Sequence, residues 1–255
     1  MGKEESIVQK PRTLLSEAVL PQSADDLAKF MDQPLTAIAE AITGMLAAGP
    51  TSWTVMAGHI VQAILKGKLY EQVSQEIKQL REKGKIPDDF ADEKKHKYGF
   101  KSWVELLTII DEETPDSDRL EALKAMFYGI NKVNATDGER IAGYQLFQIA
   151  KKLTSGQVLY LRACYKLYTE GSLQAQNMDV VQWLGRVGQV LGHNVIGLLE
   201  QDDNAVRDYG LVTDRLTMDR NKISTRDAHL SPLGLIFCKN IETYHQEVFS
   251  ECGAG

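Results

Sequence analysis

Histidines are the first residues to consider for chemistry, because an imidazole can serve as a metal ligand or as a general base near neutral pH. A helical zinc site needs two histidines four residues apart, as in H-E-x-x-H. No two histidines of this chain have that spacing, so the sequence predicts no zinc site; they are His59, His96, His193, His229 and His245. We expect a partly buried structural role for His59 and a turn position for His193.

A dense group of carboxylates is the second candidate for metal binding. Calcium loops place oxygen ligands at alternating positions and a glycine at the sixth. Pro115 interrupts the series here and that glycine is missing, which favours acids that stabilise the start of a helix. The group consists of Asp111, Glu112, Glu113, Asp116 and Asp118.

The three cysteines, Cys164, Cys238 and Cys252, are widely spaced and form no C-x-x-C pair, so no disulfide framework is predicted. Cys164 and Cys238 lie in apolar segments without a pattern of basic neighbours, and we expect them to be buried as small apolar side chains. The glycine pattern of a P-loop or a dinucleotide site is also missing. The sequence therefore predicts no catalytic residue, no metal and no cofactor.

Two charged segments near the C-terminus are candidate binding sites. Residues 215–226, here called the wing, carry four cations against the single acid Asp219, and such a patch can bind phosphates; the cations are Arg215, Arg220, Lys222 and Arg226. The preceding helix is acidic, and its carboxylates would repel a nucleic acid, which favours a protein-binding surface instead. This second group consists of Glu200, Asp202, Asp203, Arg207 and Asp208. A solvated surface hairpin without a binding role is the remaining alternative for the wing.

Helix-start patterns recur along the chain and predict a mainly α-helical fold. Capping boxes are expected at 102–105, 136–139 and 154–157, and Thr114-Pro115-Asp116 suits a helix start with proline at the first helical position. A charged amphipathic helix is expected over 68–83, and further helices over 179–191, up to Asp208, and after Ser231. We expect residues 1–22 to form a loose arm and residues 23–153 a helical domain.

Residues 35–66 are unusually apolar, without a charged residue from Ala41 to Leu65. Gly49-Pro50 divides the segment into two helices of roughly 14 residues, each about 21 Å long. Neither would cross a hydrocarbon core of about 30 Å. The segment is therefore predicted to be a buried helical hairpin, with membrane insertion as the alternative.

The C-terminal segments follow the order of a winged helix-turn-helix: three helices, the ending Gly210-Leu211-Val212, a polar two-stranded hairpin around residues 220–222 and a last helix. The residues DYGLV and HLSPLGLIFCKNI resemble the closing hairpin and helix of bacterial winged-helix proteins. They are also similar to the C-terminal part of the abortive-infection (Abi-alpha-like) family. The resemblance covers about the last third of the chain and implies a winged-helix-like domain over residues 154–255. It brings no catalytic motif.

Composition limits the function further. The net charge of −6, with 43% hydrophobic and 25% charged residues, is that of a globular protein without a basic excess for general nucleic-acid binding. The first fifteen residues lack a continuous apolar stretch, so we expect a cytoplasmic protein. Our first hypothesis is a non-enzymatic interaction or regulatory protein, in bacterial phage defence, that binds a protein partner. The alternatives are a DNA-binding transcriptional regulator that uses the wing and a membrane-active effector that inserts residues 35–66.

Overall fold

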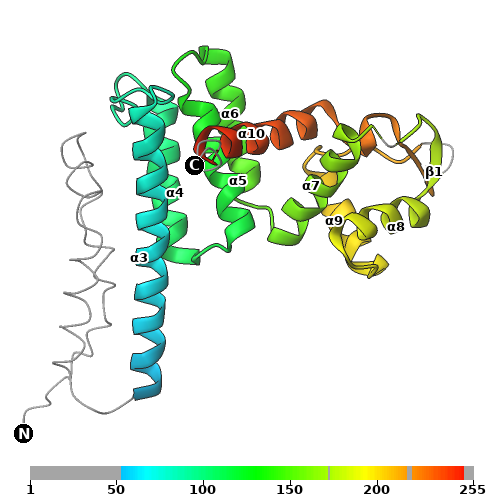
Figure 1. Cartoon of the computed structure of the whole chain (residues 1–255), viewed down its shortest axis with the longest axis horizontal. Helices are drawn as coiled ribbons and strands as arrows, with labels where there is room; N and C mark the ends of the chain where they lie inside the picture. Colours follow the sequence, from blue (N-terminus) through cyan, green and yellow to red (C-terminus); the bar gives the residue numbers. More distant parts are fainter. Residues whose placement is uncertain (1–52, 172, 217–219, 250–255) are drawn as a thin grey trace, which may run out of the picture. The chain divides into compact units, whose positions relative to one another are not determined.

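The protein is mainly α-helical, as the sequence predicts (Figure 1). The computed structural model describes residues 53–171, 173–216 and 220–249, and side chains within the first of its helices from Leu65 onward. The helices are α3 (Trp53–Glu82), α4 (Lys97–Glu113), α5 (Ser117–Asn131), α6 (Asp137–Ala150), α7 (Ser155–Thr169), α8 (Val180–Leu191), α9 (Ile196–Asp208) and α10 (Pro232–Phe249). Two short strands, β1 (Asn177–Asp179) and β2 (Lys222–Ser224), and the 3-10 helix η1 (Arg226–His229) complete the described elements.

The chain divides into two compact units. The first contains the chain up to Gln75 together with Ala91–Thr114, and the second contains Glu76–Phe90 and the chain from Pro115 onward. The boundary predicted between residues 153 and 154 falls inside the second unit and stays a prediction. None of the helices in the described ranges has the length and apolar composition needed to cross a bilayer.

In the first unit, α3 packs along α4. The Tyr70 hydroxyl donates to the carbonyl oxygen of Leu107 at 3.1 Å, and Lys66 pairs with Asp111 at 3.1 Å. Trp103 and Ile110 of α4 are buried. Part of the predicted hairpin, residues 35–52, lies outside the described residues. The remainder belongs to α3, which continues to Glu82. The helix predicted over 68–83 is confirmed as the second half of this long helix, and only its separation from the preceding helix is wrong.

Two predicted helix starts are also wrong. The capping box at Ser102 does not form, because α4 begins at Lys97 and contains Ser102, whose hydroxyl donates to the carbonyl oxygen of Gly99 at 2.9 Å. A serine can bond to the preceding turn in this way, which lets the helix pass through it. The start near Pro115 is displaced by two residues, since Asp116 is the N-cap of α5 and accepts from the backbone N–H of Arg119. Asp116 and Asp118 thus cap and start a helix, as expected, whereas Asp111, Glu112 and Glu113 lie in the last turn of α4.

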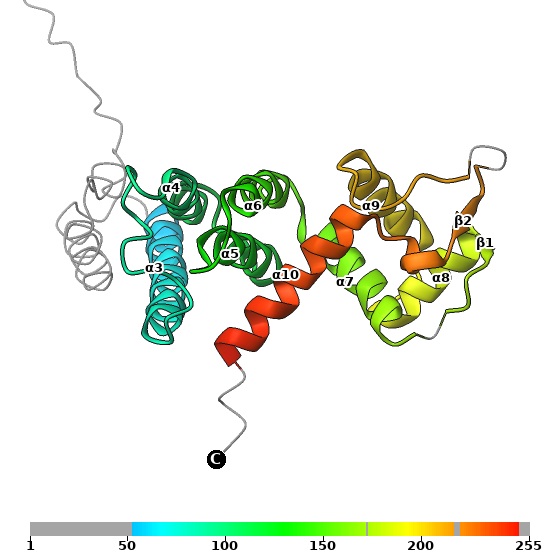
Figure 2. The same ribbon diagram turned by 90° about the horizontal axis from the view of Figure 1, so that it is seen from above.

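In the second unit, α5 packs between α6 and α10 (Figure 2). A buried ion pair joins Lys124 of α5 to Glu76 at 2.6 Å, and the Tyr244 hydroxyl of α10 donates to the same carboxylate oxygen. The Lys124 ammonium group also lies 5.7 Å from the centre of the Tyr244 ring. The capping boxes predicted at Thr136 and Thr154 are confirmed and begin α6 and α7.

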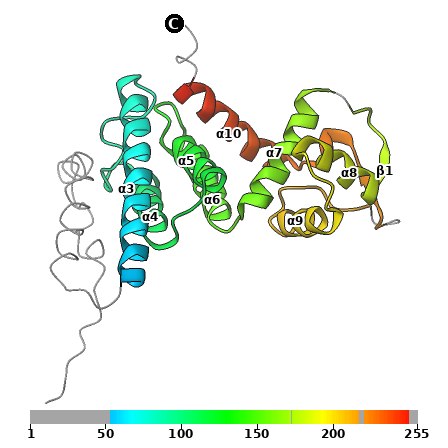
Figure 3. The same cartoon turned by 60° about the horizontal axis from the view of Figure 1, so that its bottom comes forward.

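The remaining elements of the second unit, α7, β1, α8, α9 and β2, gather at the N-terminal end of α10 (Figure 3). β2 pairs antiparallel with β1, with Met178 opposite Ile223. The hairpin predicted around residues 220–222 includes residues 217–219, which lie outside the described residues, so it stays a prediction. The two arms around residues 217–221 still approach each other through the bridge between Val212 and Leu230 and through Leu216 N–H donating to Lys222 C=O at 3.1 Å.

Close backbone packing fixes the turn between α8 and α9. Gly192 ends α8 in the left-handed conformation, with φ of 77°, and His193 N–H donates to the carbonyl oxygen of Gly188 at 3.0 Å. A Cβ atom at Gly188 would lie 2.4 Å from the carbonyl oxygen of His193, whereas one at Gly185 would meet nothing within 4 Å. Only glycine fits at 188 without moving the turn.

We predict opposite effects for alanine at these two glycines of α8. Gly188→Ala should lower the free energy of unfolding by about 1–3 kcal/mol, because the turn must move to admit the methyl group. Gly185→Ala should raise it by about 0.5–1 kcal/mol, since alanine restricts the unfolded chain and favours the helix. Urea unfolding of the two variants beside the wild type measures both changes. Equal stabilities for the two variants would contradict the packing described here.

Candidate functional site

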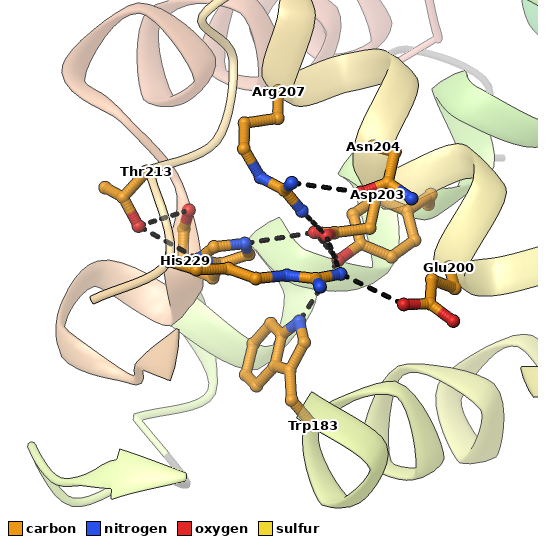
Figure 4. Close-up of polar contacts among 9 residues, drawn as sticks. Trp183, Glu200, Asp203, Asn204, Arg207, Thr213 and His229 are labelled. Atoms are coloured by element: carbon orange, nitrogen blue, oxygen red, sulfur yellow. Dashed lines mark hydrogen bonds and ion pairs between the residues drawn. The ribbon is translucent and has the colours of Figure 1, made fainter. Parts of the chain in front are cut away.

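A single buried carboxylate, that of Asp203 on α9, lies at the centre of the elements that follow residue 154 (Figure 4). Its Oδ1 atom accepts a hydrogen bond from the Tyr160 hydroxyl of α7 at 2.8 Å and lies 3.0 Å from His229 Nε2 of η1. The Trp183 indole N–H of α8 donates to the Tyr160 oxygen at 3.1 Å. One side chain of α9 is thus connected to α7, α8 and η1.

Two arginines approach the other oxygen of Asp203. Arg207, one turn further along α9, pairs with Oδ2, and Arg215 Nη2 lies 3.4 Å from the same atom. Arg215 also pairs with Glu200 at 3.3 Å, and Arg207 donates to the Asn204 side-chain oxygen at 3.0 Å. Because a buried carboxylate requires compensating charge and hydrogen bonds, both cations are directed into this cluster rather than toward solvent. We call Tyr160, Trp183, Asp203, Arg207, Arg215 and His229 the Asp203 cluster.

His229 reaches Asp203 through an unusual backbone. Asp227, Ala228 and His229 all have positive φ, at 56°, 49° and 65°. Each such conformation costs of order 1–3 kcal/mol and persists only where the surrounding structure imposes it. Thr213 helps to impose it, since its N–H donates to the His229 carbonyl oxygen at 2.9 Å and its hydroxyl lies 2.9 Å from His229 Nδ1.

The line Thr213–His229–Asp203 has the hydroxyl–imidazole–carboxylate order of a nucleophilic triad. The carboxylate can only accept, so Nε2 carries the hydrogen that faces Asp203. Both the imidazole and the carboxylate are completely buried, however. A general base must come within hydrogen-bond reach of its substrate, and this imidazole is covered. The arrangement therefore positions α9 against η1 and supports no catalytic step.

The protonation of the cluster follows from its hydrogen bonds. Burial alone would raise the pKa of Asp203, but hydrogen bonding and attraction by His229, then the charge of Arg207 and the Tyr160 hydroxyl, hold that pKa below its usual value. Burial, with Cys164 and Asp203 nearby, raises the pKa of Tyr160 well above the usual value. Asp203 is thus an ionised acceptor at neutral pH, and Tyr160 is a protonated donor.

The four cations proposed for nucleic-acid binding differ in their exposure to solvent. The Arg215 side chain is only 18% exposed and belongs to the Asp203 cluster. Arg220, Lys222 and Arg226 lie on the surface. The wing therefore offers three surface cations for phosphate contacts instead of four.

The acidic group is not the outward-facing surface that the sequence suggests. Asp203 is buried, so the expectation that four carboxylates project from α9 is wrong for it. Glu200 pairs with Arg215, and Asp202 packs against Gly156, where a Cβ atom would lie 3.1 Å from its carboxylate. Asp208 is exposed. Asp202, Asp203 and Asp208 follow Glu200 by two, three and eight residues. In a helix with 3.6 residues per turn these steps turn the acids to different sides of α9, which explains why only some face solvent.

The cysteines and the remaining candidate histidines contribute no further site in the described part of the chain. Cys164 and Cys238 are buried, as predicted, and the Cys238 thiol donates to the carbonyl oxygen of Leu161. His193 is exposed in the α8–α9 turn. The side chain of His59 and all of Cys252 lie outside the part of the chain whose side chains are described.

Exposed apolar side chains on α8 and at the start of α9 are a feature that no sequence motif indicates. Val181 on α8, Val195 before α9 and Leu198 on α9 are 61%, 52% and 55% exposed. They are among the most exposed large apolar residues in the described part of the chain. The uncharged run 187–199, here called the α8–α9 corner, could have revealed two of them, because a surface turn with no charged residue is unusual.

Comparisons with known proteins return no relative for this chain: no family model, no curated protein and no solved structure matches it.

We predict that Asp203→Asn lowers the free energy of unfolding by about 3–5 kcal/mol at neutral pH, because it leaves buried cations without their carboxylate. A carboxyl group whose pKa is lower in the folded than in the unfolded protein stabilises the fold fully when the pH is above its unfolded-state pKa of about 4. This stabilisation is lost as the pH falls through the pKa of the folded state. The gap between wild type and variant should therefore narrow below about pH 4. Urea unfolding from pH 7 to pH 3 tests this, with Asp208→Asn, an exposed acid on the same helix, as the control. A constant gap, or an equal effect in the control, would contradict it.

Proposed function

We propose that residues 154–255 form a winged-helix module that binds a protein partner and catalyses no reaction. The order of its elements supports the module: helix α7, strand β1, helices α8 and α9, a return past Val212, strand β2 and helix α10. In this comparison α8 and α9 are the helix-turn-helix pair, and α9 is the recognition helix. In a winged helix, a strand that precedes the helix pair aligns with the returning arm of the wing. The pairing of β1 with β2 fits this arrangement.

The observation that carries the protein-binding part is the chemistry of the α8–α9 face. Val181 at the start of α8 and Val195 and Leu198 at the start of α9 are exposed apolar side chains of this helix pair, and Arg186 is its exposed cation. The cations that a phosphate-binding face would use, Arg207 and Arg215, are instead held by Asp203. Charged residues are depleted and apolar residues enriched at the centre of protein interfaces, whereas DNA-binding faces rely on Lys and Arg contacts to phosphate. This face fits the former description.

DNA binding is the second candidate, and a specific observation favours it. Gln201 and Asn204 are exposed on α9, and such amide side chains can read adenine in the major groove. The wing follows α9 in the sequence, and its cations Arg220, Lys222 and Arg226 are exposed as well. Asp208 at the end of α9 and Asp227 beside Arg226 oppose phosphate binding. We rank this function second.

The phage-defence part of the first hypothesis and the membrane-active alternative rest on the sequence alone. A role in bacterial phage defence depends on the resemblance to the Abi-alpha-like family. The membrane-active alternative depends on residues 35–66, of which 35–52 lie outside the described residues. Both stay predictions.

Site-specific photo-crosslinking in living host cells tests the protein-binding function. A photoreactive amino acid at position 198 should give a crosslinked product that protease removes and nuclease leaves intact. The same amino acid at position 141, an exposed isoleucine on α6, is the matched control and should give much less product. A nuclease-sensitive product at position 198 would place the DNA-binding function first. Equal protein products at positions 198 and 141 would remove the evidence for a specific face.

A further inference from the structure

The α8–α9 corner presents two neighbouring apolar side chains on a surface without formal charge. Residues 187–199 contain no Asp, Glu, Lys or Arg. Leu198 N–H donates to the carbonyl oxygen of Val195, the N-cap of α9, at 3.1 Å, so the two exposed residues are neighbours at the start of this helix. Apolar residues on a protein surface are usually scattered singly, so this adjacent pair is suited to a contact.

The backbone beneath the pair is held in place. The left-handed Gly192 and the close approach of Gly188 to His193 fix the path of the turn between the helices. A partner that binds here would not have to order a loop, and such ordering is one of the main costs of association. The corner is therefore a preformed surface.

An acid continues the same stripe along α9. Asp202 follows Leu198 by four residues, so these two side chains share one side of α9, and Val195 directly precedes the helix. Burial raises the pKa of Asp202, while nearby His193 acts in the opposite direction. The cation of this helix, Arg207, is occupied by Asp203. The stripe is thus apolar at the start of α9 and acidic one turn later.

We infer that the stripe Val195–Leu198–Asp202 docks a basic amphipathic segment of the protein partner. The apolar side chains of that segment cover Val195 and Leu198, and a lysine or arginine reaches Asp202, in the mode of a helix laid on an apolar surface. This inference rests on the proposed protein-binding function and names the chemistry of the partner.

Charge complementarity selects this occupant over others. Nucleic acids and anionic lipid surfaces are negatively charged, so Asp202 and Asp208 repel both. A second copy of the chain joined by a twofold axis would bring the same acids together, since such an interface uses the same patch twice. A basic segment is attracted by the carboxylate and also covers the apolar pair.

Two synthetic peptides of about 18 residues, roughly five helical turns, test the inference with the full-length protein. Both carry leucines at i, i+3, i+4 and i+7, with lysines at the polar positions of one and glutamates in the other. Fluorescence anisotropy at physiological salt should show binding of the lysine peptide on the order of 10 µM and binding of the glutamate peptide about tenfold weaker.

Three variants locate the peptide on the protein. Leu198→Ser should weaken binding of the lysine peptide by about tenfold, whereas Ile141→Ser on α6, the matched control, should leave it unchanged. Asp202→Lys should reverse the preference so that the glutamate peptide binds better. These residues are exposed or half-buried, and circular dichroism checks that each variant keeps the wild-type helix content.

Equal affinity for the two peptides, an equal effect of Leu198→Ser and Ile141→Ser, or no lysine-peptide binding up to about 100 µM would overturn the inference. A crosslink at position 198 that joins two copies of this chain would also overturn it. If position 198 crosslinks another protein while the two peptides bind equally, only the basic chemistry of the partner is wrong. If position 198 gives no more protein product than position 141, the proposed function itself fails.

Discussion

The buried charge of Asp203 is the constraint on which the elements after residue 154 depend. A carboxylate without solvent is tolerated only when hydrogen bonds and opposite charges surround it. Tyr160 supplies a hydrogen bond from α7, His229 supplies one from η1, and Arg207 and Arg215 supply charge. The left-handed backbone at residues 227–229 is explained by the same requirement, because it turns the His229 imidazole toward the carboxylate.

This internal requirement also decides what the surface of α9 can offer. Each arginine held by Asp203 is one cation fewer for binding a polyanion, and Arg215 is the clearest case because the sequence placed it in the basic wing. Among the exposed side chains of the helix pair are the apolar Val195 and Leu198, beside the charged Arg186 and Asp208. The proposed preference for a protein partner over DNA rests on this use of the two arginines inside the fold.

Local features were predictable from the sequence, and long-range ones were not. Thr136 and Thr154 begin helices as predicted, because a capping box closes within four residues and needs no other part of the fold. Ser102 has the same pattern but lies inside α4, which begins five residues earlier at Lys97. The burial of Asp203 depends on Tyr160, 43 residues away, and on His229, 26 residues away. The i, i+4, i+7 spacing of Leu199, Asp203 and Val206 places this acid on the buried face of α9, but the partners that compensate its charge cannot be read from the local sequence. The pairing of β2 with β1 was missed for the same reason.

Hydrogen exchange measured by mass spectrometry tests most directly whether Asp203 joins α9 to the returning arm of the wing. The wild type and Asp203→Asn should be compared under native conditions, where amide protection reports local opening. The account predicts that α9 and residues 222–230 lose protection together in the variant, while α5 and α6 keep theirs. Loss of protection confined to α9, with residues 222–230 unchanged, would contradict the claim that this one carboxylate holds both elements.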